Sequence, residues 1–368
     1  MKHFPLLVPL LVPVQALLPI LGSGPVQALL PSLWRGVPSR PVSVYTSDVC
    51  VLHEPGRPSL AGYTHPEQPA RLKRLLTAVR TRWVKEFGSS LRLLEPEVDV
   101  TAKQLLRVHT RAHLNRLNDA FARARLFRKA KLDSDTIASP GSRAAVLRAA
   151  GLVVRAVDDL LGAEAAGNGS ASRRAFVMVR PPGHHAERGS PQGFCFVNNV
   201  LVGVAHAQAV HGVGRVAILD FDVHHGNGDA DIAEPDPTRL YVSSHEVPNF
   251  PGTGEERGAT GRHRTILSAP LRSSSGSAEF RRAWRDELLP AVRAFQPEAI
   301  FVSAGFDAHA EDPLSSCRLS DADFAWITAE VAKIGRGALP IISVLEGGYN
   351  VERLDRSVRA HVKALIDA

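Results

Sequence analysis

Six short runs of aliphatic and β-branched residues constrain the fold of this chain more than any other feature. Each run is almost continuously apolar rather than alternating, which is typical of strands buried on both faces of a parallel sheet. The runs lie at residues 42–46, 175–180, 216–222, 240–244, 299–304 and 341–345. Longer stretches with helical periodicity alternate with them, at 68–85, 142–161, 197–211, 278–295, 321–338 and 351–367. This alternation predicts one doubly wound α/β domain without an internal boundary.

The first 41 residues differ in composition from the rest of the chain. They contain no Asp or Glu, they are rich in Leu and Val, and their prolines recur at intervals that would interrupt a membrane-spanning helix. An acid-free, apolar leader is typical of a targeting segment that is removed from the mature protein. We therefore predict a targeting or disordered leader over residues 1–41 and a folded domain over 42–368. An organelle, either plastid or mitochondrion, is the predicted destination. The alternatives are the secretory route, or a cytoplasmic or nuclear protein with a plain extension.

The net charge of +7 does not by itself indicate a nucleic-acid partner. Part of the basic excess lies in a run over residues 116–131, which has no aromatic ladder and no base-reading motif. We interpret this run as a solvated helix face, and we expect neither nucleic acid nor a membrane as a direct partner. The three cysteines have no paired spacing, which argues against a disulfide framework and against a thiolate zinc site.

Polar side chains gather directly after four of the predicted strands. In open parallel sheets, ligands bind beyond the carboxyl ends of the strands, so side chains at these ends are expected to meet at one edge of the sheet. The side chains concerned are His184, His185, Asp222, His224, Asp307 and Tyr349. Their shared position predicts a functional site at that edge.

Asp222 and His224 are two residues apart at the end of a predicted strand, so both point to the same side and can share one ion. Asp307, after the strand at 299–304, would supply a third ligand. Two carboxylates and one imidazole leave a fourth position for water, the pattern of a catalytic zinc site. Iron(II) accepts the same ligands, so zinc and iron both stay open. A turn-capping Asp222 beside a satisfied core histidine is the plainer alternative, but it does not account for the third strand-end acid.

The loop Gly183-His184-His185 offers the acid–base groups that amide hydrolysis needs. One group must take a proton from the attacking water, and one must give a proton to the departing amine. Asp220 is the natural carboxylate to orient His184. Tyr349, in Glu346-Gly347-Gly348-Tyr349, is placed to donate its hydroxyl to the developing oxyanion. From this motif alone, an ordinary turn aromatic is the equal alternative.

Together these motifs resemble the histone deacetylase superfamily, and the match extends over residues 42–368. The motifs are HPEQPAR (65–71), RPPGHH (180–185), GFCFVNN (193–199), LDFDVHHGNG (219–228), PGTG (251–254), SAGFDAHAEDP (303–313) and EGGYN (346–350). The resemblance implies an arginase–deacetylase fold, in which helices flank a central eight-stranded parallel sheet. It also implies a zinc-dependent amidohydrolase that releases acetate and a primary amine from an N-acetyl amide.

Carried over position by position, the resemblance assigns a role to each site residue. One zinc ion per chain would be held by Asp222, His224 and Asp307. His185 would be general base and acid, and His184 would be an electrostatic partner held by Asp220. Tyr349 would polarise the scissile carbonyl. The residues implied to contact substrate along the tunnel and at its rim are Gly193, Phe194, Phe250, Leu314 and Asp135. A potassium ion would be bound by Asp220, by Ser243 and by the main-chain oxygens of Asp222 and His224.

Two positions indicate the class II-like and bacterial-amidohydrolase branch of the superfamily and its substrates. Asn227 stands where class I enzymes carry a second Asp behind the second histidine. Leu314 stands where polyamine-selective relatives carry a glutamate, so a cationic polyamine gains no special attraction. The expected substrate is acetyl-lysine in a protein or a small N-acetylated amine.

Two other functions remain as alternatives to the deacylase. A catalytically silent acyl-lysine-binding module would require a broken ligand or catalytic position, and none of the quoted motifs has one. An arginase-like binuclear hydrolase would require further Asp and His ligands for a second metal ion. The strand end at 219–225 offers only one clean Asp–His pair.

Overall fold

The computed structural model describes residues 41–56, 64–165 and 172–368, which belong to one compact unit spanning Ser39–Ala368. The leader predicted over residues 1–41 lies outside these residues except for its last position, so its nature stays a prediction. No helix in the described part of the chain is long and apolar enough to cross a membrane.

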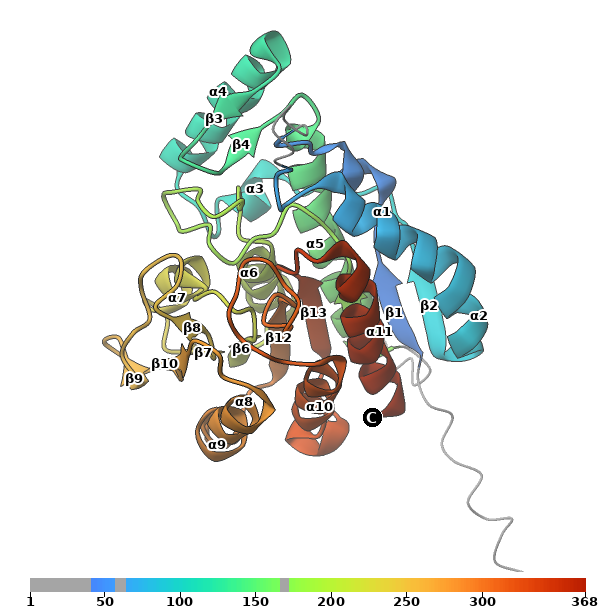
Figure 1. Ribbon diagram of the computed structural model, residues 1–368, viewed down its shortest axis with the longest axis vertical. Coiled ribbons are helices and arrows are strands. Elements are labelled where there is room, and N and C mark those ends of the chain that lie inside the picture. Colours follow the sequence, from blue (N-terminus) through green and yellow to red (C-terminus); the bar gives the residue numbers. More distant parts are fainter. Residues whose placement is uncertain (1–40, 57–63, 166–171) are drawn as a thin grey trace, which may run out of the picture. The chain divides into compact units, whose positions relative to one another are not determined.

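The described domain is built around one nine-stranded sheet with the strand order β2-β1-β5-β13-β12-β6-β7-β10-β9 (Figure 1). Its strands are β1 (Val42–Tyr45), β2 (Leu91–Leu94), β5 (Arg174–Val177), β6 (Val216–Asp220), β7 (Arg239–Ser243), β9 (Gly258–Thr260), β10 (Ile266–Ser268), β12 (Ala299–Ala304) and β13 (Ile341–Leu345). Eight of these strands pair in parallel, and β9 pairs antiparallel with β10. The predicted eight-stranded parallel sheet is therefore confirmed, with an antiparallel ninth strand at one edge.

Helices cover both faces of the sheet. In Figure 1, α10 and α11 lie in front of the central strands, and α5 and α6 lie behind them. The helices are α1 (Pro69–Ala78), α2 (Val84–Phe87), α3 (Ala102–Leu105), α4 (Arg111–Phe127), α5 (Ser142–Ala165), α6 (Asn199–His211), α7 (Asn227–Ala233), α8 (Ser277–Ala283), α9 (Leu289–Phe295), α10 (Asp321–Ala332) and α11 (Val351–Asp367). The helix predicted over 321–338 ends early, because Gly335 and Arg336 take left-handed backbone angles (φ of 60° and 59°).

Two small two-stranded sheets lie outside the main sheet. One joins β3 (Ala130–Lys131) to β4 (Ile137–Ala138), and the other joins β8 (Glu246–Val247) to β11 (Leu271–Arg272). The hairpin of β3 and β4 follows α4, and Figure 1 shows both at one end of the described domain, away from the main sheet.

The strand order places the predicted site loops side by side. β5, β13, β12 and β6 are consecutive neighbours, run parallel and are almost completely buried. The loops that follow these four strands carry the predicted His, Asp and Tyr residues, so the sheet brings them to one edge.

Candidate metal centre and active-site cavity

Asp222, His224 and Asp307 converge at the carboxyl ends of β6 and β12. One ligand atom from each residue lies within 4.8 Å of the others. His224 Nδ1 is 3.0 Å from Asp222 Oδ1 and 3.2 Å from Asp307 Oδ2. All three side chains are buried. The structure therefore brings together the three residues that the sequence predicts as metal ligands.

The immediate surroundings of these residues fit a metal ion. Asp307 Oδ2 is buried and has no hydrogen-bond partner among the described residues, which is costly for a carboxylate oxygen unless a cation faces it. A Cβ atom on Gly347 would lie 1.9 Å from Asp307 Oδ2, and one on Gly305 would lie 2.0 Å from Asp222 Oδ2. Only glycine at these two positions leaves room for the carboxylates. Two carboxylates and one imidazole form a donor set suited to zinc or iron(II).

The charges at this site also favour a cation. Burial alone would lower the pKa of His224, but the neighbouring carboxylates of Asp222 and Asp307 raise that pKa to about 10. Burial and the neighbouring Asp222 carboxylate raise the pKa of Asp307. Two buried carboxylates that face each other repel, and a divalent ion between them would relieve that repulsion.

His184 is held beside the metal ligands by two acidic residues. Its backbone N–H donates to Glu346 Oε2 at 3.1 Å, and its Nδ1 lies 3.2 Å from Asp220 Oδ2. Burial would lower the pKa of His184, but the charges of Asp222 and Asp220 raise it well above its ordinary value. The two carboxylates therefore favour the protonated, positively charged form of His184.

The pKa of His185 is shifted in the opposite direction to that of His184. Its Nδ1 lies 2.8 Å from Asn227 Oδ1, and the Asn227 amide is oriented because its Nδ2 donates to Glu187 Oε1 at 2.8 Å. An amide oxygen can only accept, so the proton of His185 is on Nδ1 and the lone pair is on Nε2. Burial, followed by the charges of His184 and His224, lowers the pKa of His185 well below its ordinary value. The pKa values of the two neighbouring imidazoles are thus shifted in opposite directions, and His185 keeps a lone pair on Nε2.

A cavity of about 220 Å³ opens onto this cluster. Its lining residues are Asp135, His185, Gly193, Phe194, His224, Asn249, Phe250, Leu314 and Tyr349. All five residues predicted to contact substrate are among them. The Phe250 ring lies edge-on to His185, with centroids 4.9 Å apart, and the Phe194 ring lies 5.8 Å from that of Tyr349. The cavity is therefore narrow, and aromatic rings lie against its catalytic candidates His185 and Tyr349. Asn249 is not among the predicted residues, although it directly precedes Phe250 and the PGTG motif.

Tyr349 is fixed from two sides by residues whose roles the sequence did not reveal. Its backbone N–H donates to Asp312 Oδ2 at 2.6 Å. Arg71 donates to Gly348 O at 2.6 Å and to Glu346 O at 2.5 Å, and its guanidinium carbon lies 4.8 Å from the centre of the Tyr349 ring. The motifs quoted above contain all three of these residues, Arg71, Asp312 and Glu346. A sequence motif does not show, however, which backbone groups a side chain binds.

The residues predicted for a monovalent cation lie next to the metal ligands. Asp220 on β6 and Ser243 on β7 are direct partners in the sheet register. Ser243 Oγ also lies 2.8 Å from His245 Nδ1. A monovalent-cation site at these residues stays a prediction.

A second His–Asp cluster lies between α5 and α6, at Asp158, His206 and His211. The Nε2 atoms of His206 and His211 are 2.7 and 2.8 Å from the same oxygen, Asp158 Oδ1. Arg107 lies 3.0 Å from His206 Nδ1, and a guanidinium can only donate. His206 must then carry its proton on Nε2, the atom that a metal would need. Hydrogen bonds alone account for this cluster.

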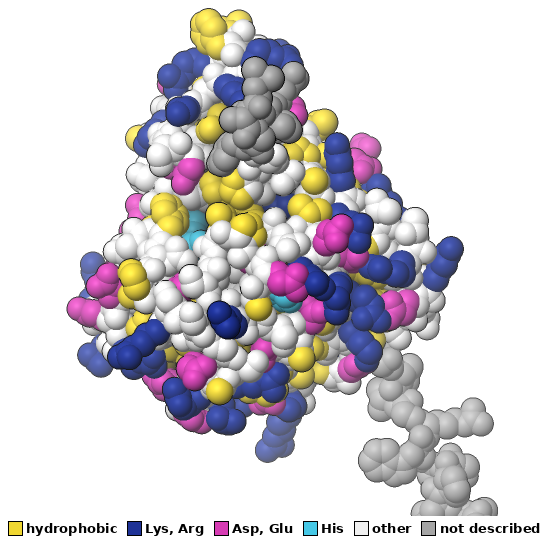
Figure 2. Space-filling view, viewed as in Figure 1, with side chains coloured by type: hydrophobic (Ala, Val, Ile, Leu, Met, Phe, Trp, Pro, Cys, Tyr) yellow, Lys and Arg dark blue, Asp and Glu magenta, His cyan; other side chains and the backbone are white. Residues whose placement is uncertain are grey.

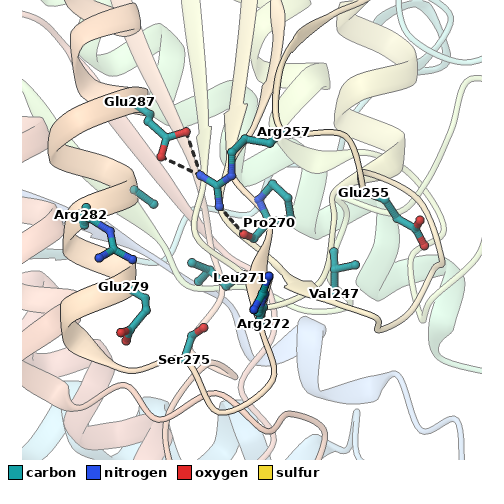
Figure 3. Close-up of a pocket in the computed structure, with 11 residues that line it drawn as sticks. Val247, Glu255, Arg257, Pro270, Leu271, Arg272, Ser275, Glu279, Arg282 and Glu287 are labelled. Carbon is teal, nitrogen blue, oxygen red and sulfur yellow. Dashed lines mark hydrogen bonds and ion pairs between the residues drawn. The ribbon is translucent and has the colours of Figure 1, made fainter.

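A larger cavity, of about 820 Å³, lies between α8, the helical turn at Trp284–Leu288 and the loops around β8 and β11 (Figure 3). Across it, Arg257 pairs with both carboxylate oxygens of Glu287 and donates to Pro270 O (Figure 3). None of the predicted site residues lines this cavity. The groups suited to hydrolysis surround the smaller cavity instead.

Comparisons with known proteins agree with this arrangement. Residues 65–365 match the histone deacetylase domain, and the chain belongs to this family. The chain is 36% identical over 308 residues to an uncharacterized protein of Synechocystis, covering 83% of this chain and 95% of that protein. It is 33% identical over 318 residues to histone deacetylase 14, chloroplastic, of Arabidopsis thaliana (82% and 73% covered). It is 35% identical over 321 residues to a probable deacetylase of Methanothermobacter thermautotrophicus (86% and 90% covered).

A solved structure has the same fold. The crystal structure of the HDA15 HD domain aligns with a TM-score of 0.79 at 30% identity, covering 89% of each chain. The family and the arginase–deacetylase fold predicted from the sequence are thereby confirmed.

Proposed function

We propose that this protein is a zinc-dependent deacylase that hydrolyses an N-acetyl amide and releases acetate and a primary amine. The observation that carries the proposal is the convergence of Asp222, His224 and Asp307, with an unpartnered buried oxygen on Asp307, beside the 220 Å³ cavity that His224 lines. Membership of the histone deacetylase family supports the same reaction class.

Asp222, His224 and Asp307 would hold one zinc ion, which when bound polarises the acyl carbonyl and lowers the pKa of water. His185 Nε2 takes a proton from the attacking water and later gives it to the departing amine, because its lone pair faces the cavity while Nδ1–H stays on Asn227. His184, held by Asp220, lies beside the reacting centre as an electrostatic partner of His185. The Tyr349 hydroxyl donates to the developing oxyanion, an interaction worth about 3–4 kcal/mol in comparable sites.

The cavity supports a substrate with a slender acyl-amine arm. Phe194 and Phe250 form apolar walls for the extended chain, and Leu314 adds no charge that would attract a polyamine. Asp135 at the rim can accept hydrogen bonds from a peptide backbone. We infer acetyl-lysine in a protein, or a small N-acetylated amine, as the substrate class.

Further parts of the proposal concern the ion, the domain and the compartment. Potassium would bind at Asp220, Ser243 and the main-chain oxygens of Asp222 and His224. The catalytic domain would cover residues 42–368, after a leader over 1–41. A plastid destination is supported by the similarity to relatives from rice and Arabidopsis whose names describe them as chloroplastic.

The direct test is acetate release by the purified protein with zinc and potassium present. The substrates should include an acetyl-lysine peptide, an N-acetyl arylalkylamine and an N-acetylpolyamine. We expect turnover of one of the first two, loss of turnover with a chelator, and recovery on adding zinc. Binding of an acetyl-lysine peptide without any turnover would identify a silent binding module, and two metal ions per chain would indicate the binuclear hydrolase.

A further inference from the structure

The last turn of α4 exposes two large apolar side chains that the fold does not use. Leu126 is 75% exposed and Phe127 is 73% exposed. Earlier in the helix, Leu117, Phe121 and Ala124 are buried against the domain. The five consecutive residues 125–129 are all exposed, and the helix ends where Arg128 takes a φ of 68°. The end of α4 therefore extends beyond the packed core.

A set of basic side chains flanks this apolar pair on both sides in the sequence. The members are Arg123, Arg125, Arg128, Lys129 and Lys131, and all five are exposed. None of them forms an ion pair or a side-chain hydrogen bond with another described residue. Asp119 is the only acidic residue between 111 and 131. Figure 2 shows the result as hydrophobic surface bordered by Lys and Arg side chains at the end of the domain where Figure 1 places α4.

We propose that this α4 tip, formed by Leu126, Phe127 and the five basic residues around them, docks the protein on a bilayer surface rich in anionic lipid. The apolar pair would enter the boundary between head groups and acyl chains, while the long basic side chains reach the lipid phosphates. This inference goes beyond the proposed function and does not depend on it. It also revises the expectation that the protein has no membrane partner. A solvated helix face accounts for the exposure of the basic side chains, but it does not account for the exposure of Leu126 and Phe127.

The shape and composition of the tip favour a bilayer over the other anionic partners. A nucleic acid would neutralise the basic residues but would leave Leu126 in water, and one aromatic ring is no stacking platform. An acidic protein would need a complementary surface of about 800 Å² per partner, whereas the apolar part of the tip is one pair of side chains. A convex apolar pair within a basic ring matches a surface into which it can insert shallowly.

The tip is connected to the cavity rim through the hairpin of β3 and β4. Lys131 lies on β3, and Asp135 in the following turn lines the 220 Å³ cavity. Thr136 Oγ1 accepts a hydrogen bond from Phe194 N at 3.1 Å, which ties the hairpin to the cavity wall. Docking through the α4 tip would therefore hold the cavity mouth near the membrane surface.

The test is flotation of the full chain with vesicles of phosphatidylglycerol and phosphatidylcholine, compared with vesicles of phosphatidylcholine alone. We expect binding only to the anionic vesicles, and weaker binding when salt is raised from about 0.1 M to about 0.5 M. Two double variants, Leu126→Ser with Phe127→Ser and Arg125→Glu with Lys129→Glu, should each reduce partitioning at least about tenfold.

Matched controls separate the tip from general effects. Val210→Ser removes another exposed apolar side chain, at the end of α6, where Val210 is 52% exposed. Lys73→Glu with Lys85→Glu makes the same change in net charge on α1 and α2. Both controls should bind like the unaltered protein. Every variant retains residues 1–41, so any binding by that segment is the same in each.

A polarity-sensitive fluorophore on Phe127→Cys tests insertion directly, because Cys50, Cys195 and Cys317 are buried. We expect its emission to shift to the blue on anionic vesicles. The proposal is overturned if the tip variants bind vesicles as well as the controls do, or if the fluorophore shows no shift. It is also overturned if the protein prefers a DNA or RNA oligonucleotide at the same salt and the Leu126→Ser, Phe127→Ser variant keeps that preference.

Discussion

The described domain contains two His–Asp clusters that satisfy the same simple distance criterion, and they differ in almost everything else. At Asp222, His224 and Asp307 all three side chains are buried, and one carboxylate oxygen has no hydrogen-bond partner. At Asp158, His206 and His211 the Asp158 side chain is 45% exposed, and both imidazoles share one of its oxygens.

The difference shows that a metal site is distinguished by buried ligand atoms without hydrogen-bond partners rather than by short distances between the ligands. The separations in the second cluster, 2.7 and 2.8 Å, are shorter than the 3.0 and 3.2 Å of the first. Its hydrogen-bond needs are already met, because Arg107 fixes the His206 tautomer and Asp158 accepts from both rings. Only the first cluster holds buried charge that protein groups do not satisfy.

The largest expected effect is loss of metal and of turnover in Asp307→Ala. Removing one of three ligands should leave less than about one zinc ion per ten chains and should lower kcat/KM by more than about 10³-fold, since the metal is worth several kcal/mol in the transition state. Zinc content after gel filtration and acetate release would measure this. The matched variant Asp158→Ala should keep both, and equal losses in the two variants would refute the comparison.

Tyr349→Phe separates chemistry from metal binding within the first cluster. It removes one hydroxyl that donates to the oxyanion, so kcat should fall roughly 10²- to 10³-fold while zinc content and affinity for a hydroxamate inhibitor are retained. An unchanged kcat would show that Tyr349 does not act in the reaction.

Asn227→Asp tests the protonation state of His185. A carboxylate at Nδ1 would raise the pKa of His185, and catalysis requires its Nε2 to be unprotonated. Activity rises as pH increases through that pKa, so the acidic limb of the kcat/KM profile should move up by about one pH unit. The control Asp158→Asn should leave the limb in place. A limb that stays fixed in Asn227→Asp would mean that another group controls it.

The smallest expected effect concerns the second cluster itself. In the Asp307→Ala background, Arg107→Ala removes the guanidinium that donates to His206 Nδ1. The imidazole proton can then move to Nδ1, which leaves the Nε2 lone pair available to a metal. Zinc affinity should then rise about tenfold. This is the lower end of the change in metal affinity that follows when the hydrogen-bond partner of a ligating imidazole is altered. Calorimetric titration would detect this. Tight zinc binding at Asp158 with Arg107 intact would contradict the account of this cluster.

The centre of the fold followed from the sequence, and its periphery did not. The six predicted strands are the almost completely buried ones, because a strand buried on both faces is mostly hydrophobic. β2 escaped prediction because it is partly exposed, β10 because it has only three residues, and β9 because it is an antiparallel edge of intermediate burial. Edge strands carry no continuous apolar signal.

For the site, the sequence identified the chemical groups but not the contacts that orient them. Asp222, His224 and Asp307 follow from residue type and strand position. Arg71 holds the Gly348 carbonyl across 277 residues of sequence, and no local pattern encodes such a contact. The second cluster lies on helix surfaces without a motif, and its tautomer depends on Arg107, almost 100 residues before His206.

Anomalous diffraction at the zinc edge, from crystals grown with stoichiometric zinc, tests the central claim most directly. We expect one peak per chain, about 2.0–2.2 Å from His224 Nδ1 and from an oxygen of each of Asp222 and Asp307. A peak at Asp158 with none between these three residues, or two peaks at the cavity, would contradict a single-metal deacylase.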